Sequence, residues 1–211
     1  AMGVVLGGDA SVATNGFWSA LTMATTLKLP MLFYIEDNGY GISVPASRQT
    51  PGGDIAANLA SFQNLRILSG DGSDPEAAAA LIETAVTAVR SGDGPVFLRL
   101  TVPRLSGHSG QDTQAYKSAG EIAAERARDP LLNLRRRLVP AVLAEAEWKA
   151  LEDGANEAVL VALKAVESRP PAWEGAGTKY ALTARRPDGS VELQRQGGRQ
   201  AEQQAVFDGA V

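Results

Sequence analysis

The sequence contains no cysteine and only one histidine, His108. Without cysteine the chain cannot form disulfide bonds, thiolate metal sites or a cysteine nucleophile, and this composition fits a reducing compartment. A single histidine also excludes zinc sites that use several histidines. The chain therefore lacks the residues for thiol chemistry and for the common zinc sites.

An excess of positive charge and long apolar runs are also missing. The 20 Lys and Arg residues against 24 Asp and Glu residues give a net charge of -4, so we expect no general binding to nucleic acid or acidic lipid. No run approaches the roughly 18 apolar residues of a membrane span, and no signal-peptide pattern opens the chain. We therefore expect a cytoplasmic protein without nucleic-acid or membrane partners.

Length and composition favour one folded domain with an appendage. The chain has 211 residues, of which 45% are hydrophobic and 21% charged, and an average domain has roughly 150 residues. After residue 169 the composition shifts towards Gly, Gln and Arg. We expect an α/β domain over residues 1–169 and, over residues 170–211, a linker or a hairpin that turns at Pro187-Asp188-Gly189.

Apolar runs alternate with helical patterns along the predicted domain, as in proteins built from βαβ units. We expect strands at residues 4–8, 31–35, 65–68 and 95–102. The runs are continuously apolar, as in Val4-Val5-Leu6, which is typical of strands covered on both faces. The sequence therefore predicts a parallel sheet with helices on both of its faces.

Helix caps and helical spacing separate these strands. We expect helices at residues 17–27, from Pro75, from Ser118, from Pro130 and over 142–166, the last interrupted near Gly154. In that last helix we expect five apolar contact residues: Trp148, Leu151, Val159, Leu163 and Val166. Residues 104–117 lose periodicity and are rich in Gly, Ser and Gln, which predicts a mobile surface loop.

Polar residues follow the first two predicted strands, namely Asp9 after the first and Asp37-Asn38 after the second. In a parallel α/β sheet, ligands bind beyond the carboxyl ends of the strands, and a right-handed crossover brings these two ends together. Magnesium prefers oxygen ligands and often adds phosphate and water. These residues could form a magnesium-diphosphate site. They could also have purely structural roles: Asp9 as a helix cap, and Asn38-Gly39 as a tight turn with positive φ at the glycine.

Three segments carry a specific resemblance: Gly7-Gly8-Asp9-Ala10, Leu27-Lys28-Leu29-Pro30 and Glu36-Asp37-Asn38-Gly39-Tyr40-Gly41-Ile42-Ser43. They resemble the thiamin diphosphate motif of 2-oxoacid dehydrogenases, in the α subunit of the decarboxylating component. The resemblance implies that Asp9, Asn38 and the carbonyl of Tyr40 bind Mg²⁺. The implied cofactor-binding residues are Gly8, Asp9, Ala10, Ser11, Asn38, Tyr40, Ile42 and His108.

Spacing separates this motif from two other glycine-aspartate triplets. Asn38 lies 29 positions after Asp9, as in the family, whereas Leu100 and Ile122 lie 29 positions after Asp71 and Asp93. Leucine and isoleucine offer no side-chain oxygen. The triplets around Asp71 and Asp93 are therefore not expected to form the site.

A second patch resembles the loop on the cofactor side of the same family, with intervals closest to the branched-chain enzymes. It comprises Arg104–Ser109, Ala115–Ser118, Glu121-Ile122 and Asp129–Leu131. The resemblance implies catalytic roles for His108, beside the diphosphate, and Arg104, which helps to hold the loop. Ser109 matches a serine that is phosphorylated in mitochondrial relatives.

The resemblance implies oxidative decarboxylation of a 2-oxo acid, with acyl transfer to a lipoyl group. It implies the cofactors thiamin diphosphate and Mg²⁺. The implied partners are a β subunit or fused β part, which together with the α subunit would form a heterotetramer, the lipoyl-bearing acyltransferase component and the 2-oxo acid. Because the β partner supplies an activating glutamate, the chain alone is expected to be inactive, and residues 170–211 are expected to lead to a fused β part.

Several positions depart from the family pattern. Ala10 replaces the last glycine of the triplet, Asp37 replaces the first asparagine, Ser106-Gly107 stands where a histidine is frequent, and Ser19 stands where a glutamate is common. Two alternatives therefore stay open. One is an acetoin dehydrogenase α subunit, which shares the motif, and the other is a non-catalytic domain that has kept the fold.

Overall fold

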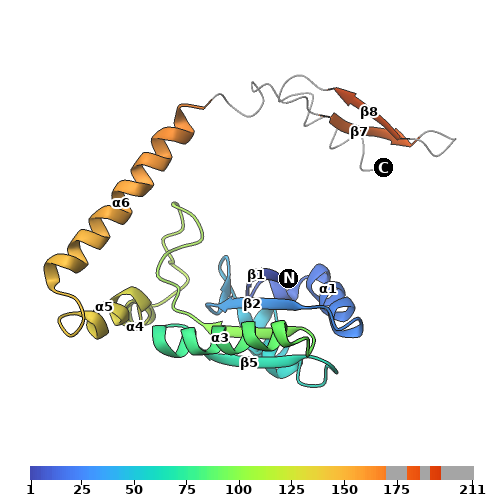
Figure 1. The fold of residues 1–211 in the computed structure, drawn as a ribbon, viewed down its shortest axis with the longest axis horizontal. Helices are drawn as coiled ribbons and strands as arrows, with labels where there is room; N and C mark the ends of the chain where they lie inside the picture. Colours follow the sequence, from blue (N-terminus) through green and yellow to red (C-terminus); the bar gives the residue numbers. More distant parts are fainter. Residues whose placement is uncertain (170–179, 186–190, 196–211) are drawn as a thin grey trace. The chain divides into compact units, whose positions relative to one another are not determined.

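The structure, a computed structural model, describes residues 1–169, 180–185 and 191–195 (Figure 1). The chain divides into two compact units, Ala1–Glu145 and Ala146–Val211. The first unit contains a four-stranded sheet, and the second contains one long helix and a pair of strands. All of the predicted site residues lie in the first unit.

The sheet of the first unit is parallel throughout. Its strands lie in the order β1-β2-β6-β5, with β1 at Gly3–Gly8, β2 at Met31–Asp37, β6 at Val96–Thr101 and β5 at Arg66–Asp71. Every neighbouring pair runs in the same direction, so all four carboxyl ends meet at one edge. The prediction of a parallel sheet is confirmed.

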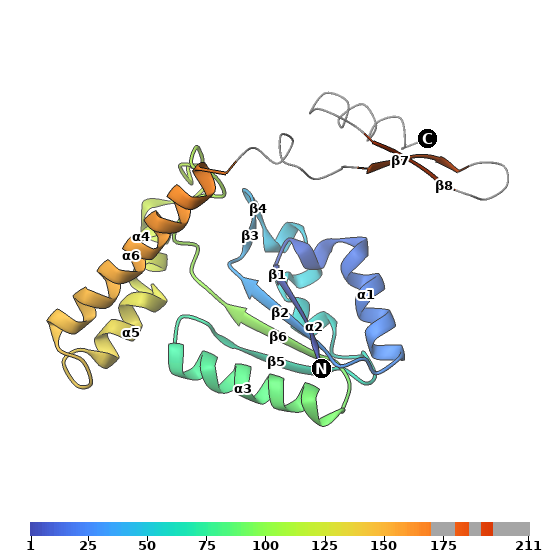
Figure 2. The ribbon, with the colours of Figure 1, turned by 45° about the horizontal axis from the view of Figure 1, so that its top comes forward.

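Helices cover both faces of this sheet, as predicted (Figure 2). On one face, α1 (Asn15–Thr26) and α2 (Ile55–Asn58) pack against Phe33, Ile35 and Phe97. On the other face, α3 (Pro75–Ser91) packs against the alternate residues, among them Leu32 and Leu98. Successive side chains of a strand point to opposite faces, so the continuously apolar runs supply two separate cores.

Local capping chemistry explains where the helices begin. Asp74 accepts hydrogen bonds from the backbone of Glu76 and Ala77 at the start of α3. Ser118 and Glu121 form a complete capping box at the start of α4 (Ala119–Ala127), and Asp129 caps α5 (Pro130–Leu138). Each cap satisfies amide groups that the first helical turn leaves without partners, and all three starts agree with the sequence.

Strand β1 differs from the prediction of a fully buried strand. Val4, Val5 and Leu6 are 52%, 42% and 74% exposed. The strand lies at the edge of the sheet and pairs only with β2, while α3 packs against residues of β2, β5 and β6. The apolar run therefore predicted a strand correctly, but the prediction that this strand is buried was wrong.

The second unit contains all but the first residue of α6 (Glu145–Glu167) and two antiparallel strands, β7 (Tyr180–Arg185) and β8 (Val191–Arg195). The strands agree with the hairpin alternative, and the predicted turn at 187–189 lies outside the described residues. Helix α6 runs through Gly154 without a break, since one interior glycine costs only about 1 kcal/mol. Of its five expected contact residues only Trp148 is buried, and the other four are 51% to 66% exposed. Within the described ranges, no helix has the length and apolar character to cross a bilayer.

Candidate functional site

The predicted metal ligands lie at the carboxyl ends of two neighbouring strands. Residue Gly8 of β1 pairs with Glu36 of β2, so Asp9 and Asp37 follow at the same level and Asn38 comes one residue later. Asp9 is 5% exposed and Asp37 is 7% exposed. The parallel register thus brings together the two sequence segments that the motif spacing singled out.

Asp9 is a buried carboxylate with an unused oxygen. Its Oδ2 atom has no hydrogen-bond partner among the described residues. Burial raises the pKa of Asp9, and the negative charge of Asp37 raises it further, although the backbone amides of Asp9 and Asn38 and the charge of Arg104 act in the opposite direction. Buried polar atoms nearly always have a partner, so an unpartnered carboxylate oxygen here fits a bound cation.

This electrostatic setting predicts how ion-free stability depends on pH. Because the folded state raises the pKa of Asp9 above 3.8, the folded protein holds this proton more tightly than the unfolded chain, and stability falls as pH rises past that value. An Asp9→Asn variant lacks this loss. At pH 7 the variant should therefore have a higher free energy of unfolding than the wild type, and this difference should shrink towards pH 4. Urea denaturation in the presence of EDTA measures it. A difference that increases as the pH falls would contradict a raised pKa of Asp9 in the folded protein.

The two other glycine-aspartate triplets are chemically satisfied. Asp71 Oδ1 accepts hydrogen bonds from Ser73 Oγ at 2.7 Å and from Arg128 Nη2 at 2.9 Å, and the bonds from Ser73 lower the pKa of Asp71. Asp93 Oδ2 accepts from Ser91 Oγ at 2.8 Å. Hydrogen bonding therefore distinguishes Asp9 from both, in agreement with the spacing.

Asn38 lies in a tight turn that directly follows β2. Asp37 Oδ1 accepts from the amide of Gly39 at 3.0 Å, and Asn38 Oδ1 accepts from the amide of Tyr40 at 3.0 Å. Gly39 has a φ of +80°, a conformation that glycine adopts without strain. The predicted turn is confirmed. Since an amide oxygen has two lone pairs, Asn38 can hold the turn and still offer an oxygen to an ion.

The carbonyl of Tyr40 faces the second predicted patch. Arg104 Nη1 donates to the Tyr40 oxygen at 3.1 Å, and the Arg104 guanidinium lies 5.9 Å and 5.8 Å from the ring centroids of Tyr40 and Tyr116. Lys117 Nζ lies 4.7 Å from the Tyr40 ring centroid. Arg104 is only 8% exposed. The two motif segments, 64 residues apart, therefore meet at Tyr40.

The close approach of Ala10 and Gly41 joins the same two segments. A Cβ atom on Gly41 would lie 2.6 Å from the Cβ atom of Ala10 and 2.6 Å from Oε1 of Gln49, well inside van der Waals contact. The extra methyl of Ala10, one of the departures from the family pattern, is accommodated because position 41 is glycine.

A Gly41→Ala substitution should therefore destabilise the protein by roughly 1–3 kcal/mol through overpacking. The double variant Ala10→Gly with Gly41→Ala should recover only part of this loss, because it removes the Ala10 methyl but leaves the Gln49 amide, which lies 2.6 Å from the same position. Urea unfolding of the two variants and of Ala10→Gly alone measures the effect. Equal losses in the single Gly41 variant and the double variant would contradict the contact.

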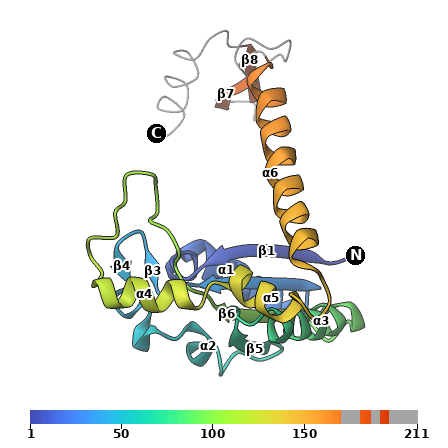
Figure 3. The ribbon, with the colours of Figure 1, turned by 90° about the vertical axis from the view of Figure 1, so that its left-hand side faces the viewer.

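The loop between β6 and α4 is irregular, as predicted, but it is organised around Asp112. Asp112 accepts hydrogen bonds from the amide of His108 at 2.7 Å, the amide of Gln114 at 2.9 Å and Tyr116 Oη at 3.1 Å, and it pairs with Arg104 at 3.5 Å. These bonds, first those from the backbone of His108 and Gln114, lower the pKa of Asp112. Figure 3 shows the loop beside the hairpin of β3 (Tyr40–Gly41) and β4 (Val44–Pro45).

Sequence reasoning missed Asp112. The available signal was that it is the only carboxylate among residues 104–117, in a loop that contains Arg104 and Lys117. An Asp112→Ala variant should exchange the amide hydrogens of His108 and Gln114 at least about tenfold faster than the wild type. NMR hydrogen exchange measures this, with Gln111→Ala as the control. Unchanged rates at both amides would show that Asp112 does not organise the loop.

A cleft of about 350 Å³ lies between the loop and the strand ends, and Glu36, Asn38, Arg104 and His108 contribute to its lining. His108 is exposed at this cleft and is anchored through its backbone amide. His108 and Arg104 therefore line the same cleft as Asn38.

Two further predicted cofactor-binding residues, Ser11 and Ile42, lie in the turns that follow the proposed ligands. Ser11 Oγ donates to the carbonyl of Gly8 at 2.7 Å, in the turn that follows β1. Ile42 is 59% exposed and has a φ of 56°, an unfavourable conformation for a β-branched residue. Such strain is characteristic of ligand-binding segments, and in Ile42 it occurs two residues after Tyr40.

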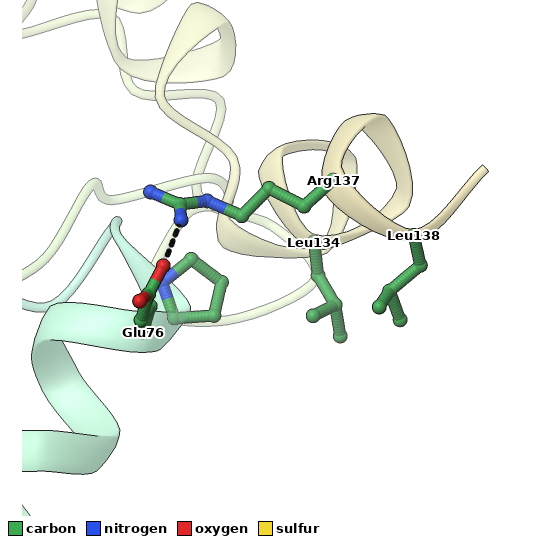
Figure 4. A pocket seen from close by; sticks show the side chains of 5 residues that line it. Glu76, Leu134, Arg137 and Leu138 are labelled. Atoms are coloured by element: carbon green, nitrogen blue, oxygen red, sulfur yellow. Dashed lines mark hydrogen bonds and ion pairs between the residues drawn. The ribbon is translucent and has the colours of Figure 1, made fainter. Parts of the chain in front are cut away.

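A larger and more apolar groove lies elsewhere, between the start of α3 and α5 (Figure 4). Leu134 and Leu138 line it, and its carboxylate, Glu76, is ion-paired with Arg137, which also binds Asp74 at 2.8 Å. With its charged groups already paired, this groove offers no free ligand for an ion.

The fold and the site define a class: a parallel α/β protein whose strand ends present side-chain oxygens next to a polar cleft. The chain belongs to the dehydrogenase E1 component family, whose model matches residues 1–173. The resemblance recognised in the sequence is thereby confirmed.

Curated relatives with substantial identity are α subunits of pyruvate dehydrogenase E1 components. The chain is 32% identical to the chloroplastic subunit alpha-3 of Arabidopsis thaliana, over 77% of this chain and 38% of the relative. It is 32% identical to the α subunit of Zymomonas mobilis, over 77% of this chain and 46% of the relative. It is 31% identical to that of Rickettsia conorii, over 80% and 52% respectively. The chain thus spans about half the length of these relatives or less.

Proposed function

We propose that this chain is the magnesium- and diphosphate-binding part of a thiamin diphosphate-dependent 2-oxoacid dehydrogenase, in the α portion of its decarboxylating component. The observation that carries the proposal is the buried, unpartnered Oδ2 atom of Asp9, next to the Asn38 turn. Family membership and the pyruvate dehydrogenase relatives support it.

The proposed ligands are Asp9 Oδ2, the side-chain oxygen of Asn38 and the carbonyl oxygen of Tyr40. One carboxylate and two neutral oxygens suit Mg²⁺, which keeps places for phosphate and water. No cluster of three or more acidic or histidine residues that could hold a metal occurs within the described ranges, so a site here depends on this mixed ligand set. The ion would offset the negative charge of a diphosphate group.

Residues of the loop would bind the diphosphate and shield the site from water. Arg104, fixed by Tyr40 and Asp112, would keep the loop over the cleft and limit the entry of water. His108 at the cleft would lie beside the diphosphate and donate a hydrogen bond to it. When bound, thiamin diphosphate supplies the electron sink for decarboxylation of a 2-oxo acid.

The remaining functional assignments belong to the same proposal. The acyl group would pass to a lipoyl group of an acyltransferase component, and a β subunit or fused β part would complete the active site, so the isolated chain would be inactive. The relatives favour pyruvate over a branched-chain 2-oxo acid as the substrate. A cytoplasmic location and an α/β heterotetramer stay predictions from the sequence.

Calorimetric titration of the chain together with its β part, with thiamin diphosphate as the titrant, tests the proposal. Binding should require Mg²⁺ and should disappear when EDTA is added. Absence of magnesium-dependent binding would overturn the proposal and favour a non-catalytic domain that has kept the fold. For the substrate, the chain reconstituted with its β part should oxidise a 2-oxo acid in preference to acetoin, and the reverse preference would identify an acetoin dehydrogenase.

A further inference from the structure

Arg99 links the metal-ligand turn to the covered face of the sheet. In β6 it lies opposite Ile35 of β2, on the face that α1 and α2 cover. Its Nε atom lies 2.6 Å from Asp37 Oδ2, and its Nη1 atom lies 3.1 Å from Asp54 Oδ1. Asp54 is the N-cap of α2 and accepts from the amide of Ala57. One guanidinium therefore connects the end of β2 with the start of α2.

Both oxygens of Asp37 are occupied as a result. Oδ1 accepts from the amide of Gly39 at 3.0 Å, and Oδ2 accepts from Arg99. The side chains of Asp37 and Arg99 are 6% and 15% exposed, respectively, so water competes little for this pair. Gly39 lies between Asn38 and Tyr40, so the bond from its amide to Asp37 Oδ1 holds the turn that carries both proposed ligands, while Arg99 offsets the charge of Asp37.

The ion pair between Arg99 and Asp37 also distinguishes Asp9 from Asp37 as the acidic ligand of an ion. Asp9 and Asp37 follow neighbouring strands at the same level, and the charge of Asp37 acts on Asp9. Asp9 keeps one oxygen without a partner among the described residues, whereas each oxygen of Asp37 already accepts a hydrogen bond, one of them from a guanidinium. If Arg99 were absent, Asp37 would present a second, uncompensated negative charge beside the place where a diphosphate must approach.

We propose that Arg99 is a positioning residue of the magnesium-diphosphate site. It neutralises Asp37, the residue that holds the Asn38–Tyr40 turn, so that Asp9 alone supplies the acidic ligand. The inference rests on the proposed function and deepens it. It also predicts a dependence that a purely structural residue would not show: Arg99 matters only while residue 37 is charged.

A double-mutant cycle on the chain together with its β part tests this dependence, with thiamin diphosphate at saturating Mg²⁺ as the calorimetric probe. Arg99→Gln should weaken binding by about tenfold or more, as loss of supporting contacts does at metal sites. Asp37→Asn retains an oxygen for the Gly39 amide and should bind within about threefold of the wild type, and the double variant should do the same. Arg128→Gln, at the exposed Asp71 pair of β5, is the matched control and should have no effect.

The possible results separate the two proposals. A wild-type chain that fails to bind overturns the proposed function and, with it, the role of Arg99. A wild type that binds, together with an unaffected Arg99→Gln variant or with a double variant as weak as Arg99→Gln, overturns the role of Arg99 alone. If Arg99→Gln does not fold, Arg99→Lys, which keeps the charge but lacks the planar fork that reaches both Asp37 and Asp54, should still bind, within about tenfold of the wild type. Failure of a folded Arg99→Lys variant and a folded double variant to bind would equally refute the inference.

Discussion

Replacing Asp9 with asparagine is expected to weaken magnesium-dependent binding of thiamin diphosphate by about 100-fold or more. The substitution keeps the size of the side chain and removes the charge that attracts the ion. Calorimetry with saturating Mg²⁺ measures the loss. Asp71→Asn is the control, since Asp71 also ends a strand within a glycine-aspartate-glycine triplet but already bonds to Ser73 and Arg128.

The same Asp9 variant should fold at least as well as the wild type. A buried carboxylate oxygen without a donor costs free energy, and the neutral amide reduces that cost by about 1 kcal/mol. Loss of binding with retained or increased stability would show that Asp9 serves the ion rather than the fold. Equal affinity in wild type and variant would show that the ion is held elsewhere.

Replacing Phe33 with alanine is expected to lower the free energy of unfolding by about 4 kcal/mol. Phe33 is 1% exposed and packs edge-on against Phe17 of α1, with ring centroids 6.1 Å apart. It lies in β2, four residues before Asp37, and helps to hold this strand between its helices. Urea unfolding followed by circular dichroism measures the loss.

Leu6→Ala provides the matched control for the core of the sheet. Leu6 lies in the adjacent strand β1 within an equally apolar run, yet it is 74% exposed, so its truncation should change the free energy of unfolding by no more than about 0.5 kcal/mol. A large loss for Leu6→Ala would restore the original prediction of a buried strand. A small loss for Phe33→Ala would contradict the two-sided core.

The sequence predicted the parts of this molecule that depend on neighbouring residues. The cap at Asp74, the capping box at Ser118 and the Asn38-Gly39 turn involve atoms only two or three residues apart, and all three are present in the structure. The meeting of Asp9 and Asn38 was also predictable, because strand direction alone brings the carboxyl ends of parallel neighbours together.

Features that depend on residues far apart in the chain could not be predicted from the sequence. The position of β1 at the sheet edge, which exposes Leu6, follows from the order of the strands rather than from the composition of β1. Arg99 and Asp37 are 62 residues apart, and neither residue type signals an ion pair by itself. Helix α6 has a regular apolar pattern, but periodicity shows which face is apolar and does not show what covers it.

The most direct test of the account is to locate a bound divalent ion. Crystals of the chain grown with Mn²⁺, a substitute for Mg²⁺, together with thiamin diphosphate, would show the ion by anomalous scattering. We expect one peak about 2.2 Å from Asp9 Oδ2, Asn38 Oδ1 and the carbonyl oxygen of Tyr40. A peak at Asp71 or at another surface carboxylate, with the Asp9 site empty at the same Mn²⁺ concentration, would contradict it.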